Sequence, residues 1–375
     1  MAEKNRLVQL QDYDQSVWLD SISRGLMQSG QLQALVDNDG LRGMTSNPAI
    51  FEKAISGSDD YRDQLRALHA AGKSTTEVYE AVAVTDIQSA CDVLRPVYDA
   101  SDGEHGLVSL EVSPELAFDT AGTIGEVRRL WQQVDRPNLM IKIPATDEGI
   151  PAVQQMLAEG YNVNITLMFS LTDYDNVAEA YISALEARAA AGQPVNRIAS
   201  VASFFVSRID TLADELLEAR AEAGESRARE LLGKVAIANA KIAYQHFLDF
   251  FKSERFAKLE AKGARVQRVL WASTSTKNPD FSDVMYVDNL IGPHTVNTLP
   301  DDTMDAFRDH GTLAQTVDTG VAEAQAVLDA LSAVGVDYDA MTRQLQQEGV
   351  DKFVQPYHAL LERIEQVCAE LVATT

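Results

Sequence analysis

The sequence has very few of the residues that build disulfide frameworks or metal sites. Only two cysteines, Cys91 and Cys368, occur in 375 residues. Neither a disulfide framework nor a cysteine-rich zinc pattern is therefore available, and both thiols are expected to be reduced. The six histidines are scattered along the chain without the spacing of metal ligands. We expect no metal site.

Long apolar runs are also missing. No run approaches the roughly 18 residues that a membrane-spanning helix needs. The stretch from Met1 to Tyr13 is of mixed polarity and contains no apolar core of a signal peptide. We therefore expect a cytoplasmic protein without a membrane partner.

Positive charge is scarce. The chain has 32 Lys and Arg against 56 Asp and Glu, a formal net charge of -24. This balance argues against nucleic acid or an anionic membrane as a partner. A phosphorylated substrate would be repelled overall, so a local group of cations and backbone donors would have to bind it. Acidic helix faces that maintain solubility are the simpler cause of the net charge.

The chain alternates strand-like runs with helical stretches. The candidate strands are Ser16–Asp20, Leu41–Thr45, Leu107–Val112, Leu139–Pro144, Val163–Phe169, Ile198–Phe205, Val266–Trp271 and Val284–Leu290. Helical spacing is found in Val177–Ala191, Leu212–Arg220, Ser226–Phe251, Ala306–His310 and Thr319–Ala333. This alternation predicts a (β/α)8 barrel. A doubly wound sheet is the main rival, but no G-x-G-x-x-G or Walker A motif is present.

The organisation of the chain favours a single domain that spans residues 1–375. No Pro/Gly/Ser-rich linker divides it, and no internal repeat is evident. The long helical region from Ala221 to Gly263 is expected to elaborate the outer ring of helices. The final part of the chain is also helical and is expected to pack against the barrel or close it.

Lys142 stands out because it lies inside an apolar strand. The run Leu139–Thr146 reads LMIKIPAT, and Pro144 cannot continue a central hydrogen-bond ladder. A lysine there loses hydration, which favours the neutral amine that a Schiff-base nucleophile needs. By itself the octapeptide better suits a lysine that extends to the strand end or pairs with a carboxylate, and only the rest of the chain reverses this balance.

Polar residues also occur near the carboxyl ends of the other candidate strands. They are Asp20, Asn47, Glu111, Asn164, Thr166, Ser203, Arg208 and the run Ser273–Asn278. Each has an ordinary explanation alone, such as a turn at Asn47-Pro48 or a satisfied core amide at Asn164. Catalytic side chains of a barrel project from these strand ends, and so many polar groups would be costly in an apolar barrel. Together they predict one site.

Four motifs, in order and spacing, resemble the transaldolase family. They are LRGMTSNP at Leu41–Pro48, IKIPAT at Ile141–Thr146, NVNITLMFS at Asn162–Ser170 and SFFVSR at Ser203–Arg208. The matches span most of the chain, and its length resembles the longer bacterial form. The resemblance implies a cofactor-free transferase of the pentose phosphate pathway. It would move a dihydroxyacetone unit from sedoheptulose 7-phosphate or fructose 6-phosphate to glyceraldehyde 3-phosphate or erythrose 4-phosphate.

The resemblance also implies roles for individual residues. Lys142 would form the Schiff base, and Asp20 would take the C4 hydroxyl proton that triggers C3–C4 cleavage. Glu111, with Thr166 and a water, would shuttle protons during imine formation and hydrolysis. The residues expected to bind substrate are Asn47, Asn164, Ser203, Phe205, Arg208, Ser275 and Lys277. The partners are sugar phosphates, and the protein would be a monomer or homodimer.

Two positions depart from the family's usual pattern. Lys277 stands where the family often has arginine, which grips phosphate bidentately whereas lysine acts as a point charge. The hydroxyl group that contacts phosphate is also open among Ser273, Thr274, Ser275 and Thr276, with Ser275 favoured by its offset from Asn278.

Two alternative functions remain. A fructose-6-phosphate aldolase-type enzyme of the same superfamily would also use a Schiff base, but such proteins are more compact and tend to have glutamine in place of Glu111. A non-catalytic sugar-phosphate-binding barrel would retain Arg208 and Lys277 only. In that case Lys142, Asp20 and Glu111 would be buried charges that cost stability without serving chemistry.

Overall fold

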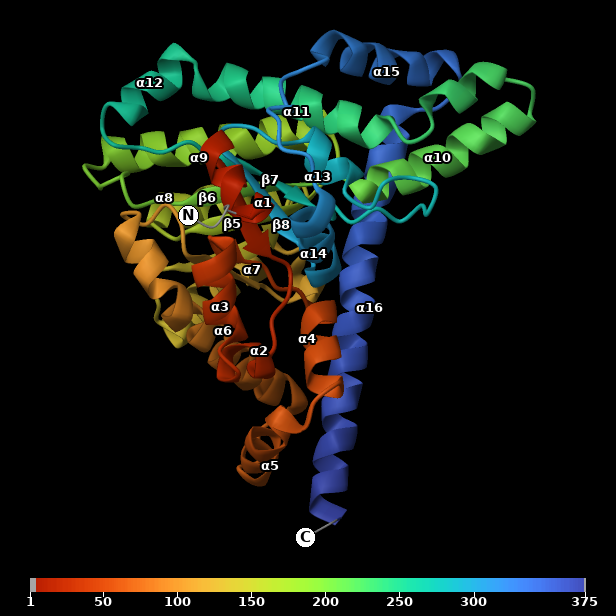
Figure 1. The fold of residues 1–375 in the computed structure, drawn as a ribbon. Coiled ribbons are helices and arrows are strands. Elements are labelled where there is room, and N and C mark those ends of the chain that lie inside the picture. Colours follow the sequence, from red (N-terminus) through yellow and green to blue (C-terminus); the bar gives the residue numbers. More distant parts are fainter. Residues whose placement is uncertain (1–4, 374–375) are drawn as a thin grey trace.

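Eight parallel strands form a closed barrel in the order β1 to β8 (Figure 1). This computed structural model describes residues 5–373; residues 1–4, where the N-terminal stretch considered above begins, and 374–375 lie outside it. The strands are β1 Gln15–Leu19, β2 Gly43–Met44, β3 Leu107–Glu111, β4 Leu139–Pro144, β5 Val163–Met168, β6 Ser200–Phe205, β7 Arg268–Ala272 and β8 Thr295–Leu299. The predicted (β/α)8 barrel is confirmed.

Helices surround the barrel. The α-helices are α1 Arg6–Gln9, α2 Arg24–Gln28, α3 Gln31–Asp39, α4 Pro48–Ser56, α5 Arg62–Ala70, α6 Thr75–Ala100, α7 Thr120–Val134, α8 Gly149–Glu159, α9 Leu171–Ala190, α10 Ser207–Glu222, α11 Val235–Phe251, α12 Glu254–Glu260, α13 Met285–Asn289, α14 Asp301–His310, α15 Val321–Ala333 and α16 Tyr338–Ala373. The described residues also form the 3-10 helices η1 Leu10–Tyr13, η2 Asp59–Tyr61, η3 Pro114–Leu116 and η4 Ser226–Leu231. Within residues 5–373, no helix has the length and apolarity needed to traverse a bilayer.

The prediction for the eighth strand is wrong. Val284–Leu290 contains the short helix α13, whose Val287 is fully buried. The strand that closes the barrel is β8, which pairs with β1 from Thr295 opposite Gln15 to Leu299 opposite Leu19, and also with β7. A short apolar run suits a buried helical turn as well as a strand, so periodicity alone could not separate the two.

β5 contains an irregularity next to the predicted site. Its register with β6 shifts between Ile165 and Met168, and Leu167 has a φ of 58°. A left-handed backbone is uncommon for a branched residue, and bulges of this kind redirect the side chains beside them. The affected neighbour is Thr166, one of the predicted catalytic residues.

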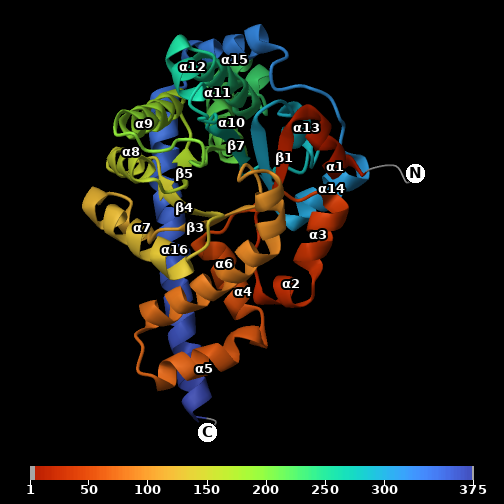
Figure 2. The same ribbon diagram turned by 90° about the vertical axis from the view of Figure 1, so that its left-hand side faces the viewer.

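The longest helix, α16, lies across the carboxyl-terminal ends of β4 and β5. In Figures 1 and 2 it runs along one side of the barrel and continues past α4 and α5 towards the C-terminus. It packs against α4, α5, α6 and α10. Gln346 of α16 donates hydrogen bonds to the backbone oxygens of Ala145, 2.9 Å away, and Leu167, 3.4 Å away. Through these contacts α16 joins the carboxyl-terminal ends of two barrel strands to the surrounding helices.

Candidate active site

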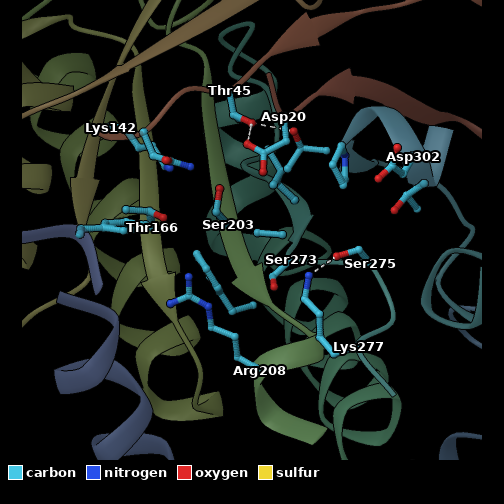
Figure 3. Close-up of a pocket in the computed structure, with 18 residues that line it drawn as sticks. Asp20, Thr45, Lys142, Thr166, Ser203, Arg208, Ser273, Ser275, Lys277 and Asp302 are labelled. Carbon is cyan, nitrogen blue, oxygen red and sulfur yellow. Dashed lines mark hydrogen bonds between the residues drawn. The ribbon is translucent and has the colours of Figure 1, made fainter. Parts of the chain in front are cut away.

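A cavity of about 330 Å³ opens at the carboxyl-terminal ends of the barrel strands (Figure 3). Its lining comes from seven of the eight strand ends, from the N-terminus of α14 and from Phe353 of α16. Nine of the eleven predicted site residues line it, namely Asp20, Asn47, Lys142, Thr166, Ser203, Phe205, Arg208, Ser275 and Lys277. The other two, Glu111 and Asn164, lie behind this lining, in contact with residues that form it.

Lys142 is held at the centre of this constellation. Parallel pairing puts it opposite Glu111 of β3 and Asn164 of β5. Its side chain is only 6% exposed, and its Nζ lies 3.3 Å from Glu111 Oε2 and 3.3 Å from the Ser46 backbone oxygen. The Glu111 carboxylate and the Ser46 carbonyl therefore fix the position of Nζ at the wall of the cavity.

Glu111 is the carboxylate that faces the lysine. Burial raises its pKa above the ordinary value for a glutamate, and Asp20 adds repulsion, while the charge and hydrogen bond of Lys142 oppose the shift. A carboxyl with a raised pKa exchanges protons more readily near neutral pH than an exposed one. The contact with Lys142 gives Glu111 access to the protons of imine formation.

Asp20 follows β1 and is oriented by two threonine hydroxyls. Thr45 Oγ1 donates to Asp20 Oδ1 at 2.6 Å and lies 2.7 Å from Thr298 Oγ1. Because one hydroxyl carries one proton, Thr298 must donate to Thr45 when Thr45 donates to the carboxylate. Burial raises the pKa of Asp20; Lys142, the Thr45 hydrogen bond and Arg208 lower it. The chain of hydroxyls therefore stabilises the ionised carboxylate.

A second polar chain links β6, β5 and β3 beside Lys142. Ser203 donates to Asn164 Oδ1 at 2.7 Å, and Asn164 Nδ2 donates to Ser109 Oγ at 3.0 Å. Asn164 thus holds the hydroxyl of Ser203, which lines the cavity. Thr166, two residues beyond Asn164, has a buried hydroxyl with no hydrogen-bond partner among the described residues. That hydroxyl is available to a substrate or a water.

Asn47 serves the local fold and the cavity at once. It is the N-cap of α4, where its Oδ1 accepts a hydrogen bond from the backbone of Ile50 at 3.0 Å, and Pro48 begins the helix. The cap uses the amide oxygen. The side-chain nitrogen is therefore the group that Asn47 can direct to a substrate hydroxyl.

Cations gather on the side of the cavity opposite Asp20. In Figure 3, Arg208 and Lys277 approach from below, with Ser275 beside Lys277. Lys277 Nζ donates to Ser275 Oγ at 2.5 Å. Burial lowers the pKa of Arg208, and its buried Nη1 has no hydrogen-bond partner among the described residues. A desolvated guanidinium with a free donor is suited to an anion such as phosphate.

The structure narrows the choice among the four hydroxyl residues after β7. Thr274 is buried and donates to Asn297 Oδ1, and Thr276 donates to the backbone of Ser282. Ser273 and Ser275 line the cavity, and Ser273 is 2.9 Å from Ser207 Oγ. Ser275 is the one that contacts Lys277.

Several residues of the cavity were not singled out from the sequence. They are Thr45, Thr298, Asp302, Thr303 and Phe353. Thr298 would have been found if the eighth strand had been placed correctly, because it lies near the end of β8. Phe353 carries no local signal, since an aromatic residue in an amphipathic helix usually belongs to the core. Among residues 5–373, no group of three or more His, Cys, Asp or Glu side chains could hold a metal ion.

Known proteins resemble this chain over nearly its whole length. The chain matches the family Transaldolase/Fructose-6-phosphate aldolase over residues 17–364. It belongs to this family. It is 50% identical over 369 residues to "Transaldolase 2" of Nostoc sp., covering 96% of this chain and 97% of that protein.

Two further members of the family are similar to this chain over most of their length. "Transaldolase" of Trichodesmium erythraeum is 47% identical over 374 residues, 98% of both chains. "Transaldolase" of Acidothermus cellulolyticus is 51% identical over 339 residues, 90% of both chains. Likeness at this level over nearly whole chains confirms the prediction of a transaldolase, an enzyme that transfers aldehyde or ketone groups.

Proposed function

We propose that this transaldolase transfers a dihydroxyacetone unit from a ketose phosphate to an aldose phosphate through a Schiff base on Lys142. The donors would be sedoheptulose 7-phosphate or fructose 6-phosphate, and the acceptors glyceraldehyde 3-phosphate or erythrose 4-phosphate. The observation that carries the proposal is the buried Lys142 Nζ, 3.3 Å from Glu111 Oε2, at the wall of a cavity that also contains Asp20 and Arg208.

Imine formation would use Lys142 and Glu111 together. The ammonium proton passes to Glu111, and the free amine attacks the C2 carbonyl of the donor to give a carbinolamine. Glu111 then returns the proton to the C2 hydroxyl, which leaves as water and produces the iminium ion. The free hydroxyl of Thr166 would hold the water that takes part in these transfers.

Carbon–carbon cleavage would use Asp20. Its carboxylate takes the proton of the C4 hydroxyl, C4 becomes an aldehyde, and the electrons of the C3–C4 bond move into the iminium to give an enamine. The aldose phosphate leaves, and the enamine then adds to the aldehyde carbon of the acceptor by the same steps reversed. The hydroxyl chain from Thr298 through Thr45 orients Asp20 for both directions.

Substrate binding would divide between the two sides of the cavity. The amide nitrogen of Asn47 and the hydroxyl of Ser203, which Asn164 orients, would hold the hydroxyls of the three-carbon unit. Arg208, Lys277 and Ser275 would bind the phosphate, with Phe205 beside Arg208. These cations attract a phosphate locally, although the net charge of -24 repels it overall.

Transfer is favoured over simple aldol cleavage by two observations. Glu111 is a carboxylate, whereas the aldolase-type relatives considered above tend to have glutamine there. The curated relatives that match nearly whole chains are named transaldolases. We also propose a cytoplasmic location, because Cys91 and Cys368 are both free, buried thiols.

Reductive trapping tests the nucleophile. The protein is incubated with fructose 6-phosphate, reduced with borohydride, and digested to locate the adduct by mass. We expect one adduct, on Lys142, and loss of both adduct and transfer in Lys142→Ala. Lys241→Met is the matched control, because Lys241 is also buried but donates to Thr319 in another part of the molecule. Transfer retained by Lys142→Ala refutes the assignment.

The products then distinguish the two Schiff-base reactions. With erythrose 4-phosphate present, a transaldolase forms sedoheptulose 7-phosphate and releases little free dihydroxyacetone. Release of free dihydroxyacetone at the rate of donor consumption, with no dependence on the acceptor, would favour the aldolase instead.

A further inference from the structure

One face of α16 both docks on the barrel and enters the cavity. Gln346, Gly349 and Phe353 are spaced by three and four residues, so they share a helix face. Gln346 hydrogen-bonds to the strand ends, as described above. Gly349 lies so close to the barrel that a Cβ there would be 2.9 Å from Leu167 Cδ2. Phe353, one turn further, is 5% exposed and lines the cavity.

The ring of Phe353 lies close to two cations of the cavity, Lys142 and Arg208. Its centroid is 5.4 Å from Lys142 Nζ and 5.9 Å from Arg208 Cζ. A second ring, Phe205, has its centroid 5.2 Å from Arg208 Cζ. No ion pair joins Arg208 to a carboxylate among the described residues, and its Nη1 keeps a free donor. Two aromatic faces therefore hold the guanidinium.

The carboxylates around Arg208 show why an aromatic contact, rather than an ion pair, matters for this side chain. Asp20, Glu111 and Glu348 are the groups whose negative charges act on the guanidinium. A carboxylate contact would occupy the N–H donors of Arg208 and neutralise its charge. An aromatic face attracts a cation through its quadrupole and occupies no donor. The rings thus keep Arg208 in place with its donors free.

We propose that Phe353 is a specificity-determining residue that positions Arg208 for the phosphate of the donor sugar. The C-terminal helix thereby makes the barrel selective for phosphorylated substrates. Without the ring, Arg208 turns towards its surrounding carboxylates and loses its free donors. This inference rests on the proposed Schiff-base function, because it assigns Phe353 a part in the binding of that reaction's substrate.

The test compares fructose 6-phosphate with unphosphorylated fructose. Borohydride trapping of the Lys142 adduct at a range of sugar concentrations gives the half-saturating concentration of each. In Phe353→Leu, which keeps the apolar bulk but loses the ring, we expect this concentration to rise about tenfold for fructose 6-phosphate, the effect of one desolvated cation–π contact. For fructose it should change by less than about twofold, since no phosphate contact is lost. Equal changes for both sugars would overturn the proposal.

Three further variants distinguish the contribution of the aromatic ring from that of helix packing. Phe353→Tyr retains the aromatic face and should restore most of the preference for fructose 6-phosphate. Leu360→Ala removes a fully buried side chain of the same helix outside the cavity and should lower the melting temperature without changing the preference. In an Arg208→Leu background, Phe353→Leu should cause no further loss. A changed preference in Leu360→Ala, or a full further loss in the double variant, contradicts the proposal.

Failure of this inference can be told apart from failure of the proposed function. If the unaltered protein forms no adduct on Lys142 with either sugar, the Schiff-base function itself is wrong. If the adduct forms and Phe353→Leu keeps the original preference, the function stands and only the role of Phe353 is refuted.

Discussion

Asp20, the proposed base, accepts a hydrogen bond that favours its ionised form. Thr45 donates to it at 2.6 Å and is itself held by Thr298. Burial pushes the pKa of Asp20 up, and the Thr45 hydrogen bond is one of the influences that bring it down. Because the proposed base must be ionised to act, the acid side of the activity profile reports this balance.

Thr45→Val should move the acid limb of the kcat/KM profile to higher pH. The valine fills the same space but donates no hydrogen bond, so the pKa of Asp20 rises further and the base becomes protonated at a higher pH. Activity at pH 6 should therefore fall more than activity at pH 8. The measurement is the rate of transfer from fructose 6-phosphate to erythrose 4-phosphate across this range.

Thr85→Val is the matched control for this substitution. Thr85 lies in α6, where its hydroxyl bonds to the Ala81 backbone oxygen outside the cavity. We expect its profile to coincide with that of the unaltered protein. An unshifted acid limb in Thr45→Val would show that Thr45 does not tune the base.

The strand ends explain why most site residues were predictable one by one. Lys142, Glu111 and Asn164 belong to three strands, and the parallel register places them side by side. Each is visible in the sequence as a polar residue within an apolar strand. Thr298 and Phe353 are not visible in this way: the first was hidden by the misplaced eighth strand, and the second lies in a helix. The roles of all the site residues stay predictions until they are tested.

Among the elements, β4 and α8 are joined by a turn that ends at Gly149, where there is no room for a side chain. At Gly149, the first residue of α8, a Cβ would lie 2.0 Å from the Pro144 backbone oxygen. That oxygen belongs to the strand that carries Lys142. The backbone of Gly149 also donates to Thr146 Oγ1 at 3.0 Å. The turn thus positions the end of the strand that carries Lys142.

Gly149→Ala should therefore destabilise the protein and lower its activity. The added methyl group must displace backbone, which typically costs about 1–3 kcal/mol of unfolding free energy. The same substitution at Gly125, an exposed position within α7 with nothing within 4 Å of its Cβ, should stabilise by about 0.5–1 kcal/mol through helix propensity. Chemical denaturation and transfer assays on both variants check this. Equal effects of the two substitutions would contradict the close contact at Pro144.

α13 and β8 are the elements for which prediction from the sequence failed. Val284–Leu290 is mostly apolar and partly buried, whereas Thr295–Leu299 is fully buried although it contains Thr295, Asn297 and Thr298. What separates them is the partner strand: β8 is the one that reaches β1 and closes the barrel. Contacts between residues so far apart in the chain leave no trace in the local pattern.

Over the whole molecule, charge is strongly unbalanced. The net charge of -24 produces self-repulsion that opposes the compact state. Exposed ion pairs such as Arg95–Asp99 and Lys352–Glu348 offset little of it, because surface pairs are each worth about 0–1 kcal/mol. That the whole chain forms one domain stays a prediction.

Added salt should therefore stabilise this protein. Raising NaCl from about 10 mM to about 150 mM shortens the Debye length from roughly 30 Å to roughly 8 Å, which screens repulsion between distant carboxylates. We expect the melting temperature to rise over this range, measured at constant pH by circular dichroism. Potassium chloride at the same ionic strength should give the same rise if screening is the cause. A lower melting temperature in salt would mean that attractive surface pairs outweigh the repulsion.

Local patterns in the sequence were sufficient to predict the barrel, because strands and helices have different periods. Motif resemblance predicted the family, and Lys142 stood out because a charged residue within an apolar strand is costly unless it serves a purpose. The tertiary structure alone decided which strand closes the barrel and which hydroxyls orient Asp20. It alone brought Phe353 from the last helix to Lys142 and Arg208. These features depend on contacts between residues far apart in the chain, which no local period encodes.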